Sequence, residues 1–230
     1  MALYPDVQRR AQEEIDRVVG RNRLPGYEDR DNLPYINAVV KEALRWHPVT
    51  PMGVAHSLME DDVCEGYRIP KGSIIMPNIW SVYPASICVA LTSMAYSVTS
   101  CRAFCHDPKD YKDPMSFNPE RFLGDTPERD PHSLAFGFGR RICPGRILAD
   151  SNLYLTMSMS LASFNIGKAV RDGKEIDVQP HFSPGMVSHP APFGVGIKPR
   201  DPKYEEIIRS VEDELQWETR DADIVRGMFK

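Results

Sequence analysis

The stretch FGFGRRICPGR, residues 136–146, surrounds one cysteine with three glycines, one proline and three arginines. Gly139 and Gly145 would let the backbone approach a bulky, flat ligand closely, and Pro144 stiffens the turn beside Cys143. A disulfide or a zinc site would need a second thiol or imidazole at a recognisable spacing, and the flanking sequence offers neither. This stretch therefore predicts an ordered loop that presents a single thiol.

A helix is predicted directly after this loop, from Arg146 to about Phe164. The free N–H groups and the positive dipole end at its start, together with Arg140 and Arg141, should favour the thiolate form of Cys143. A lone thiolate that serves a metal carrying its other ligands indicates an iron porphyrin. The alternative is a buried, unreactive cysteine, although glycine, proline and arginine are unusual neighbours for a packing residue.

Two further helices are predicted upstream. Residues 3–19 carry apolar side chains at spacings of three and four between charged ones, which is typical of an amphipathic helix. A second helix is predicted between Pro34 and Pro48. Asp31 and Asn32 are its expected N-terminal caps. Its apolar stripe consists of Ile36, Val39, Val40, Ala43 and Leu44.

Glu42 and Arg45 lie on the face of this second helix that is opposite its apolar stripe, three residues apart. Taken alone, this spacing is typical of an exposed ion pair, which contributes about 0.2–0.5 kcal/mol to helix stability. The helical pattern by itself gives these two charges no functional role.

The remaining segments predict short strands and loops. Residues 66–80 predict two short strands around a Pro-Lys-Gly turn, and residues 174–200 predict further strands and turns. The proline-rich stretch 106–132 is predicted to be an ordered loop that buries its aromatic residues, Tyr111, Phe117 and Phe122. Residues 201–230 form a polar, helix-prone tail. The chain is thus predicted to be mainly α-helical with small β-sheets.

Composition excludes some classes of function. With 28 basic and 32 acidic side chains and no basic stripe, the chain is not expected to bind nucleic acid. Five cysteines without regular spacing favour a thiol-reducing compartment. The first residues contain no apolar stretch suited to a signal peptide or membrane anchor. Residues 73–101 carry no charge, but a proline and several hydroxyl side chains interrupt their apolar run, so a membrane span is not expected.

Three motifs resemble those of the cytochrome P-450 superfamily. KEALRWHP, residues 41–48, resembles the Glu-x-x-Arg helix of that family, and FNPERF, residues 117–122, resembles its Pro-Glu-Arg-Phe meander. The resemblance covers most of residues 1–200 and is to the C-terminal half of the fold, most like fungal microsomal members. The cysteine loop resembles the haem-binding signature, in the form Phe136-x-x-Gly139-x-Arg141-x-Cys143-x-Gly145.

The resemblance implies a role for each motif. Cys143 would be the axial ligand of the haem iron, and no other catalytic residue is expected in this chain. Arg141 and His56 would contact the haem propionates. The full set of haem-binding residues would be Phe136, Gly139, Arg141, Cys143, Gly145 and His56. A buried structural network on the haem side of the core would contain Glu42, Arg45 and Arg121.

The resemblance also implies the reaction. The chain would belong to a haem-dependent monooxygenase that transfers one oxygen atom of O2 to a hydrophobic organic substrate and the other to water. Its cofactor would be haem b, and NADPH would supply electrons through NADPH-cytochrome P-450 reductase. Residues 49–54 and 184–187 correspond to segments that line the substrate pocket. A full-length homologue would be anchored in the endoplasmic reticulum membrane.

Two family features have no counterpart in the sequence: the N-terminal anchor and the central helix with its acid–alcohol pair. The similar residues 124–126, GDT, precede Pro127 and therefore cannot lie within a helix. We accordingly expect an incomplete P-450 domain over residues 1–200, soluble or aggregating on its own. The alternatives are a non-catalytic truncated gene product with weak or no haem binding, and a thiol-bearing interaction protein without a cofactor.

The sequence also contains an insertion. Family members pass directly from a segment like MPNIW to one like FCHDP, whereas this chain adds residues 81–102 between them. Our hypothesis is that these residues are translated intron.

Overall fold

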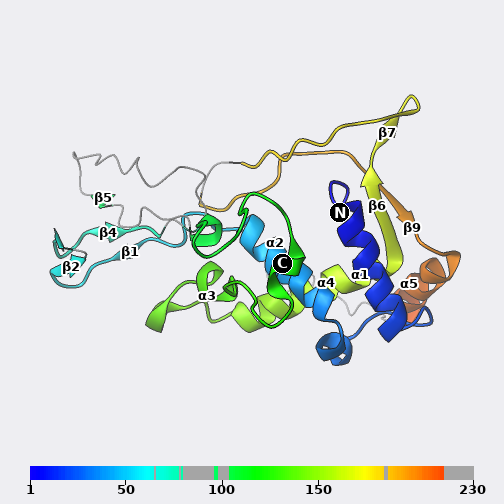
Figure 1. The fold of residues 1–230 in the computed structure, drawn as a ribbon, viewed down its shortest axis with the longest axis horizontal. Helices are drawn as coiled ribbons and strands as arrows, with labels where there is room; N and C mark the ends of the chain where they lie inside the picture. Colours follow the sequence, from blue (N-terminus) through cyan, green and yellow to red (C-terminus); the bar gives the residue numbers. More distant parts are fainter. Residues whose placement is uncertain (65, 78, 80–95, 98–103, 184–185, 215–230) are drawn as a thin grey trace, which may run out of the picture.

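Three helices, α1 (Pro5–Val18), α2 (Pro34–Trp46) and α4 (Arg146–Ser163), pack on one another and form the main core. The computed structural model describes residues 1–64, 66–77, 79, 96–97, 104–183 and 186–214. Figure 1 shows these helices together with α5 (Pro202–Glu214) on one side of the molecule, while an elongated arm of short strands extends from the other side. All three helices predicted from the sequence are present.

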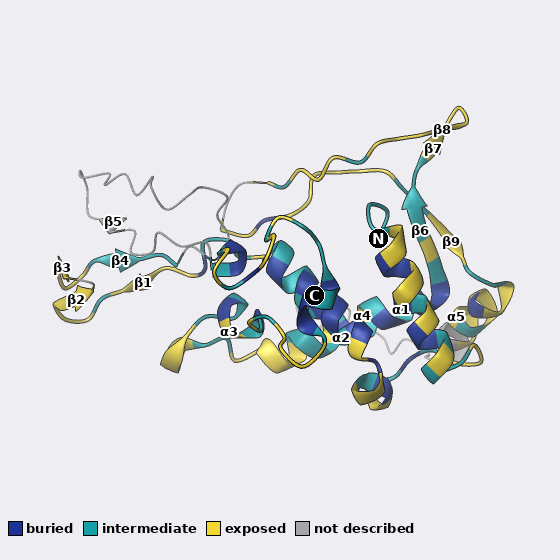
Figure 2. Cartoon of the chain, viewed as in Figure 1, coloured by how far each residue is buried: buried dark blue, intermediate teal, exposed yellow. Residues whose placement is uncertain are grey.

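The main core is built from apolar side chains spaced three or four residues apart on each helix, because that spacing places them on one helical face. Figure 2 shows buried residues concentrated where the helices meet, whereas the strand arm is mostly intermediate or exposed. The buried core residues on these helices are Val7, Ala11 and Ile15 of α1, Tyr35, Ile36, Val39 and Val40 of α2, and Tyr154, Leu161 and Ala162 of α4, and Leu33 and Tyr204 join them.

The predicted cap of α2 is wrong. Asp31 and Asn32 lie in a preceding 3-10 helix, η1 (Tyr27–Asn32), and Leu33 occupies the N-cap position without a side-chain cap. Glu14 of α1 takes their place, because its carboxylate accepts hydrogen bonds from the backbone N–H groups of Tyr35 and Ile36, each at 3.0 Å. A carboxylate satisfies the free N–H groups at a helix start equally well when it comes from another helix.

Within the described residues, the strands form four small sheets. β1 (His56–Ser57) pairs antiparallel with β4 (Ile74–Ile75), which pairs parallel with β5 (Tyr96–Ser97), and β2 (Asp62–Cys64) forms a hairpin with β3 (Tyr67–Ile69). The two strands predicted within residues 66–80 are therefore present as β3 and β4, but each pairs with a different partner. The other two antiparallel sheets join β6 (Phe164–Lys168) to β9 (Val195–Pro199) and β7 (Val170–Arg171) to β8 (Lys174–Glu175).

The proline-rich stretch is an ordered loop, as the sequence predicts. It contains η4 (Pro119–Phe122), and Tyr111 and Phe122 lie in a second buried cluster with Ala38 of α2. Phe117 is half-buried and stacks on Tyr4, with 4.9 Å between ring centroids. The fold is thus mainly helical with small sheets.

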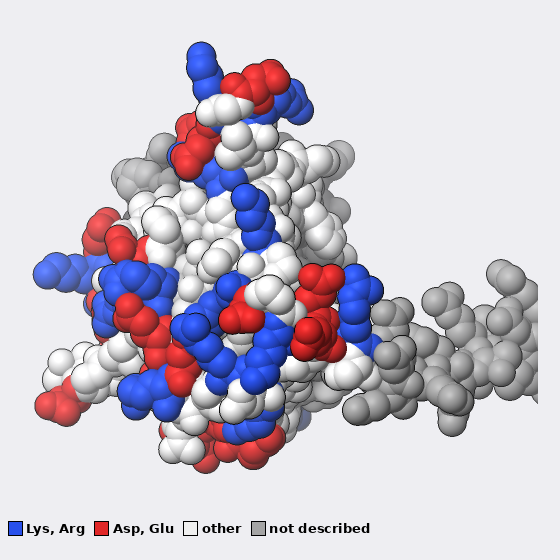
Figure 3. Space-filling model, turned by 90° about the vertical axis from the view of Figure 1, so that its right-hand side faces the viewer, with Lys and Arg blue, Asp and Glu red and all other residues white. Residues whose placement is uncertain are grey.

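The C-terminal segment continues the fold beyond β9. α5 begins at Pro202, and its Tyr204 is only 1 % exposed within the main core. Figure 3 shows the side of the molecule that carries α1 and α5, where acidic and basic side chains are interleaved. Among the described residues, no helix has both the length and the apolar character needed to cross a membrane.

Candidate functional site

The cysteine loop lies between the short helix α3 (His132–Ala135) and the start of α4. The backbone N–H of Cys143 donates to the carbonyl oxygen of Phe136 at 2.8 Å, which closes the loop on itself. The N–H of Arg146 then donates to the carbonyl of Cys143 at 3.3 Å, so the thiol is presented one turn before α4 begins. The sequence-predicted helix after the loop is therefore present, and it ends at Ser163.

Two glycines give this loop its path. Gly137 has φ +81° and Gly139 has φ +58°, both in the left-handed region that other residues rarely adopt. Gly145 has an ordinary φ of −82°, but a Cβ added there would lie 3.9 Å from the sulfur of Cys143. Gly145 thus keeps the space beside the thiol open. The requirement at Gly137 was missed in the sequence, where only its alternation with two phenylalanines could have indicated it.

The residues that flank Cys143 in the chain are largely exposed, and they include apolar and basic side chains. Cys143 is half-buried, whereas Phe138, Ile147 and Leu148 are 45 %, 68 % and 67 % exposed. Exposed apolar side chains of this size, on the loop and at the start of α4, are available to contact a ligand or a partner. Arg141 is exposed, and its side chain forms no hydrogen bond or ion pair with any described residue.

These residues fit a haem. A soft thiolate suits iron, apolar side chains suit the porphyrin faces, and a free guanidinium suits a propionate. The described part of the chain offers no alternative metal site of three or more clustered His, Cys, Asp or Glu side chains. Burial raises the pKa of Cys105 to about 12, so that thiol stays protonated and is a poor metal ligand.

His56 belongs to the strand arm. It lies on β1, where its backbone pairs with Ile75 of β4, and its side chain is exposed. Within the described residues, no hydrogen bond or ion pair joins His56 to Arg141 or to the cysteine loop. The structure therefore does not bring the two expected propionate contacts into direct contact with each other.

Glu42, Arg45 and Arg121 meet in a buried cluster. Glu42 and Arg45 form a two-pronged ion pair at 2.7 and 2.9 Å, and both side chains are 0 % exposed. Arg121 of η4 is 3.3 Å from the Glu42 carboxylate, and its side chain is 2 % exposed. This burial excludes the exposed ion pair that the helical pattern alone favoured.

The remaining donors of this cluster are also satisfied. Arg45 donates to the carbonyl oxygens of Cys105 and Pro114, each at 2.8 Å, while Arg121 binds Glu128 at 2.6 Å. Glu42 additionally accepts the N–H of Asn118 at 2.7 Å. Buried charges are tolerated when they are paired and hydrogen-bonded in this way. Glu128 and Asn118 were missed in the sequence, because no local spacing links them to Glu42.

The two segments expected to line a substrate pocket lie side by side. The N–H of Ser188 donates to the carbonyl oxygen of Val49 at 2.8 Å, and the Ser188 hydroxyl is 3.0 Å from Nε2 of His47. His47 also stacks on Phe182, and burial lowers the pKa of this histidine. Residues 184–185 lie outside the described part of the chain. The apolar residues exposed in these segments are Val49, Val54, Met186 and Val187.

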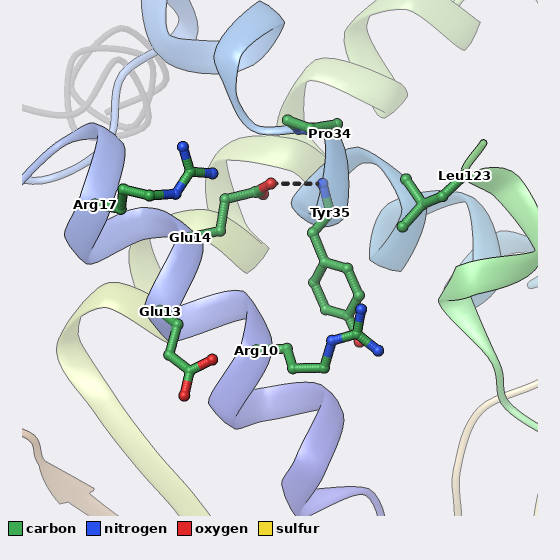
Figure 4. A pocket seen from close by; sticks show the side chains of 7 residues that line it. All are labelled: Arg10, Glu13, Glu14, Arg17, Pro34, Tyr35 and Leu123. Atoms are coloured by element: carbon green, nitrogen blue, oxygen red, sulfur yellow. Dashed lines mark hydrogen bonds between the residues drawn. The ribbon is translucent and has the colours of Figure 1, made fainter. Parts of the chain in front are cut away.

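A separate hollow of about 390 Å³ lies between α1 and α2 (Figure 4). The guanidinium of Arg10 lies 4.7 Å above the ring of Tyr35 and pairs with Glu120. Burial and the nearby Glu120 raise the pKa of Tyr35 to about 12. Figure 4 also shows Glu14 bonded to the start of α2, so this hollow is a seam between helices whose polar groups stabilise the fold.

A half-buried thiol just before a helix, in a fold that also contains a buried Glu–Arg–Arg cluster, is compatible with a protein of the haem-thiolate class. Comparison with known families agrees, since the cytochrome P450 family model matches residues 1–85 and 98–197. The chain belongs to the cytochrome P450 family. Residues 86–97, which the family model leaves unmatched, fall within the insertion inferred at 81–102. Most of that insertion lies outside the described residues, and its intron origin stays a hypothesis.

Several fungal proteins are similar to this chain. A cytochrome P450 monooxygenase, claR, of Ampulloclitocybe clavipes is 50% identical over 227 residues, which cover 97% of this chain and 38% of that protein. An O-methylsterigmatocystin oxidoreductase of Aspergillus flavus is 44% identical over 234 residues, covering 100% of this chain and 39% of that protein. The chain thus spans about two-fifths of the length of the curated relatives that it matches.

Proposed function

We propose that this chain forms the haem-binding part of a monooxygenase that inserts one atom of O2 into a hydrophobic organic substrate. The observation that carries this proposal is the open, half-buried thiol of Cys143 on a loop that matches the family's signature. Family membership supports the class of reaction, and the names of similar fungal proteins are those of monooxygenases and an oxidoreductase.

In this proposal each loop residue has a stated task. The Cys143 sulfur would hold the iron, and the hydrogen bond from the Cys143 N–H to the Phe136 carbonyl would help to fix the direction of the Cα–Cβ bond. Gly139 and Gly145 leave room for the porphyrin plane, because neither carries a side chain that would meet it. When bound, haem b supplies the oxygen chemistry, and the protein supplies the pocket and its electrostatics.

The charged side chains would position the cofactor and the core behind it. Arg141 would bind a haem propionate with its exposed guanidinium, and His56 would be a further propionate contact. The Glu42–Arg45–Arg121 cluster would hold α2 against the meander and so keep the haem side of the core rigid.

The partners follow from the same reasoning. We propose that electrons come from NADPH through NADPH-cytochrome P-450 reductase and that the complete enzyme works at the endoplasmic reticulum membrane. The apolar side chains exposed around Val49 and Val187 support a hydrophobic substrate, because they would line a pocket with few hydrogen-bonding groups.

Haem reconstitution tests the proposal. The chain is mixed with haem, reduced and exposed to carbon monoxide, and the Soret band is recorded. We expect a thiolate-type band that Cys143→Ala abolishes and that Cys64→Ala leaves unchanged, since Cys64 is an exposed thiol on β2. A thiolate-type band that persists in Cys143→Ala would refute the assignment. A chain that takes up no haem would favour the non-catalytic alternative.

A further inference from the structure

An alternating chain of charged side chains surrounds the base of the cysteine loop. The two ring nitrogens of His132 lie 2.7 Å from Asp130 and 2.9 Å from Asp150. Each carboxylate also binds a second cation. Lys41 of α2 lies 2.8 Å from Asp130, and the guanidinium of Arg30 of η1 donates two hydrogen bonds to Asp150, at 2.6 and 3.0 Å. Four separate elements therefore meet through one half-buried imidazole.

The geometry requires that this imidazole be positively charged. An ionised carboxylate only accepts hydrogen bonds, and a neutral imidazole carries a single N–H donor. His132 can satisfy Asp130 and Asp150 together only when both nitrogens are protonated. Burial lowers the pKa of His132, but the hydrogen bonds and charges of the two carboxylates outweigh burial and raise that pKa above 6.5. The pKa of each carboxyl group is lowered by its own cations, although burial opposes this shift.

The hydrogen bond between His132 and Asp150 is important because these two residues lie on either side of the cysteine loop. His132 is the first residue of α3 and Asp150 lies in the second turn of α4, so their hydrogen bond spans the two ends of the cysteine loop. The imidazole also stacks on the ring of Phe136, with 5.9 Å between centroids and 20° between planes. Phe136 in turn accepts the N–H of Cys143 through its carbonyl oxygen.

We propose that His132 is a positioning residue that, as an imidazolium, clamps the base of the cysteine loop and thereby holds Cys143 in place. The meaning of this clamp for haem ligation rests on the proposed function, whereas the clamp itself is a property of the chain without cofactor. Because the pKa of His132 is raised on folding, its contribution is complete below about pH 6.5 and is lost as the pH rises through the folded value. The loop should therefore loosen in alkaline solution.

Hydrogen exchange at the Cys143 amide tests the clamp in the haem-free chain. After correction for the intrinsic exchange rate, we expect protection of this amide to fall about tenfold or more between pH 6 and pH 9, as a hydrogen bond to a charged group is lost. His132→Gln should show the low protection already at pH 6. His181→Gln is the matched control, since His181 is exposed, and it should behave as the parent does.

A charge-retaining variant separates His132 from other groups that titrate in this range. His132→Arg keeps a permanent cation, so protection of the Cys143 amide should stay high at both pH values. A parent chain whose Cys143 protection does not change with pH would overturn the proposal, and this measurement needs no variant to fold. A pH-dependent loss that persists in His132→Arg would also overturn it, because the loss would belong to another group. Neither result depends on haem, whose binding is tested separately at Cys143.

Discussion

Removal of the Glu42 carboxylate should lower the free energy of unfolding of this chain by a large fraction. In Glu42→Ala the guanidinium groups of Arg45 and Arg121 lose their shared counter-ion in a region where both side chains are at most 2 % exposed. Glu42 also accepts the N–H of Asn118, so the variant leaves a further donor without its partner. Breaking a buried ion pair by removing one partner costs about 3–5 kcal/mol, out of a usual domain stability of about 5–15 kcal/mol.

The measurement is urea unfolding followed by circular dichroism and by tryptophan fluorescence, to which Trp46 of the same helix contributes. Glu13→Ala is the control, because Glu13 forms an exposed i,i+4 ion pair with Arg9 that is worth at most about 0.5 kcal/mol. In a double-mutant cycle, Glu42→Ala and Arg45→Ala should not be additive, since each already leaves the other charge uncompensated. An unfolding free energy of Glu42→Ala within about 0.5 kcal/mol of the parent would refute the reasoning.

Two smaller perturbations test other parts of the fold. Glu14→Ala should cost about 1 kcal/mol of unfolding free energy, because the N–H groups of Tyr35 and Ile36 lose their cap, whereas Glu14→Gln should retain part of it. Equal urea midpoints for parent and Glu14→Ala would contradict the capping role. Burial and the nearby Arg45 lower the pKa of His106 from 6.5 to about 4, so stability should be complete above about pH 6.5 and fall in acid, by about 1–2 kcal/mol at pH 5. Unfolding at pH 7 and pH 5 should show this loss in the parent and a smaller one in His106→Gln; equal losses would assign the acid effect to another group.

The sequence predicts the elements of this fold better than their partners. Apolar spacing locates α1 and α2, because a helix of this length must bury one face and the residues of that face follow a local pattern. The helix α4 was predicted from its place directly after the cysteine loop. The cap of α2 was assigned to the nearest polar residues, whereas the acceptor is Glu14, which approaches from a different helix. Strand pairing was equally beyond local reasoning, since β3 and β4 are neighbours in sequence yet belong to different sheets.

The residues of the candidate site also differ in whether the sequence alone could predict them. The position of Cys143 follows from glycine, proline and a helix start within one short stretch, so it can be predicted without tertiary information. The burial of Glu42 and Arg45 cannot be predicted in this way. It is set by the meander, which covers that face of α2 although it lies more than seventy residues away in the sequence. Family resemblance was needed to expect Arg121 there. The bridge between His132 and Asp150 gave no signal at all in the sequence, since neither residue lies in a recognised motif.

The burial of Tyr204 bears on how this protein should be produced. The family match stops at residue 197, and a recombinant version trimmed to that limit would lose Tyr204, a buried member of the main core. It would also lose Arg200, which donates to Asp16 at 2.8 Å and to the carbonyl of Ala162 at 3.1 Å. The edge of the family-model match is therefore not the edge of the packed core, and an expression boundary placed after α5 keeps Arg200 and Tyr204 in the protein.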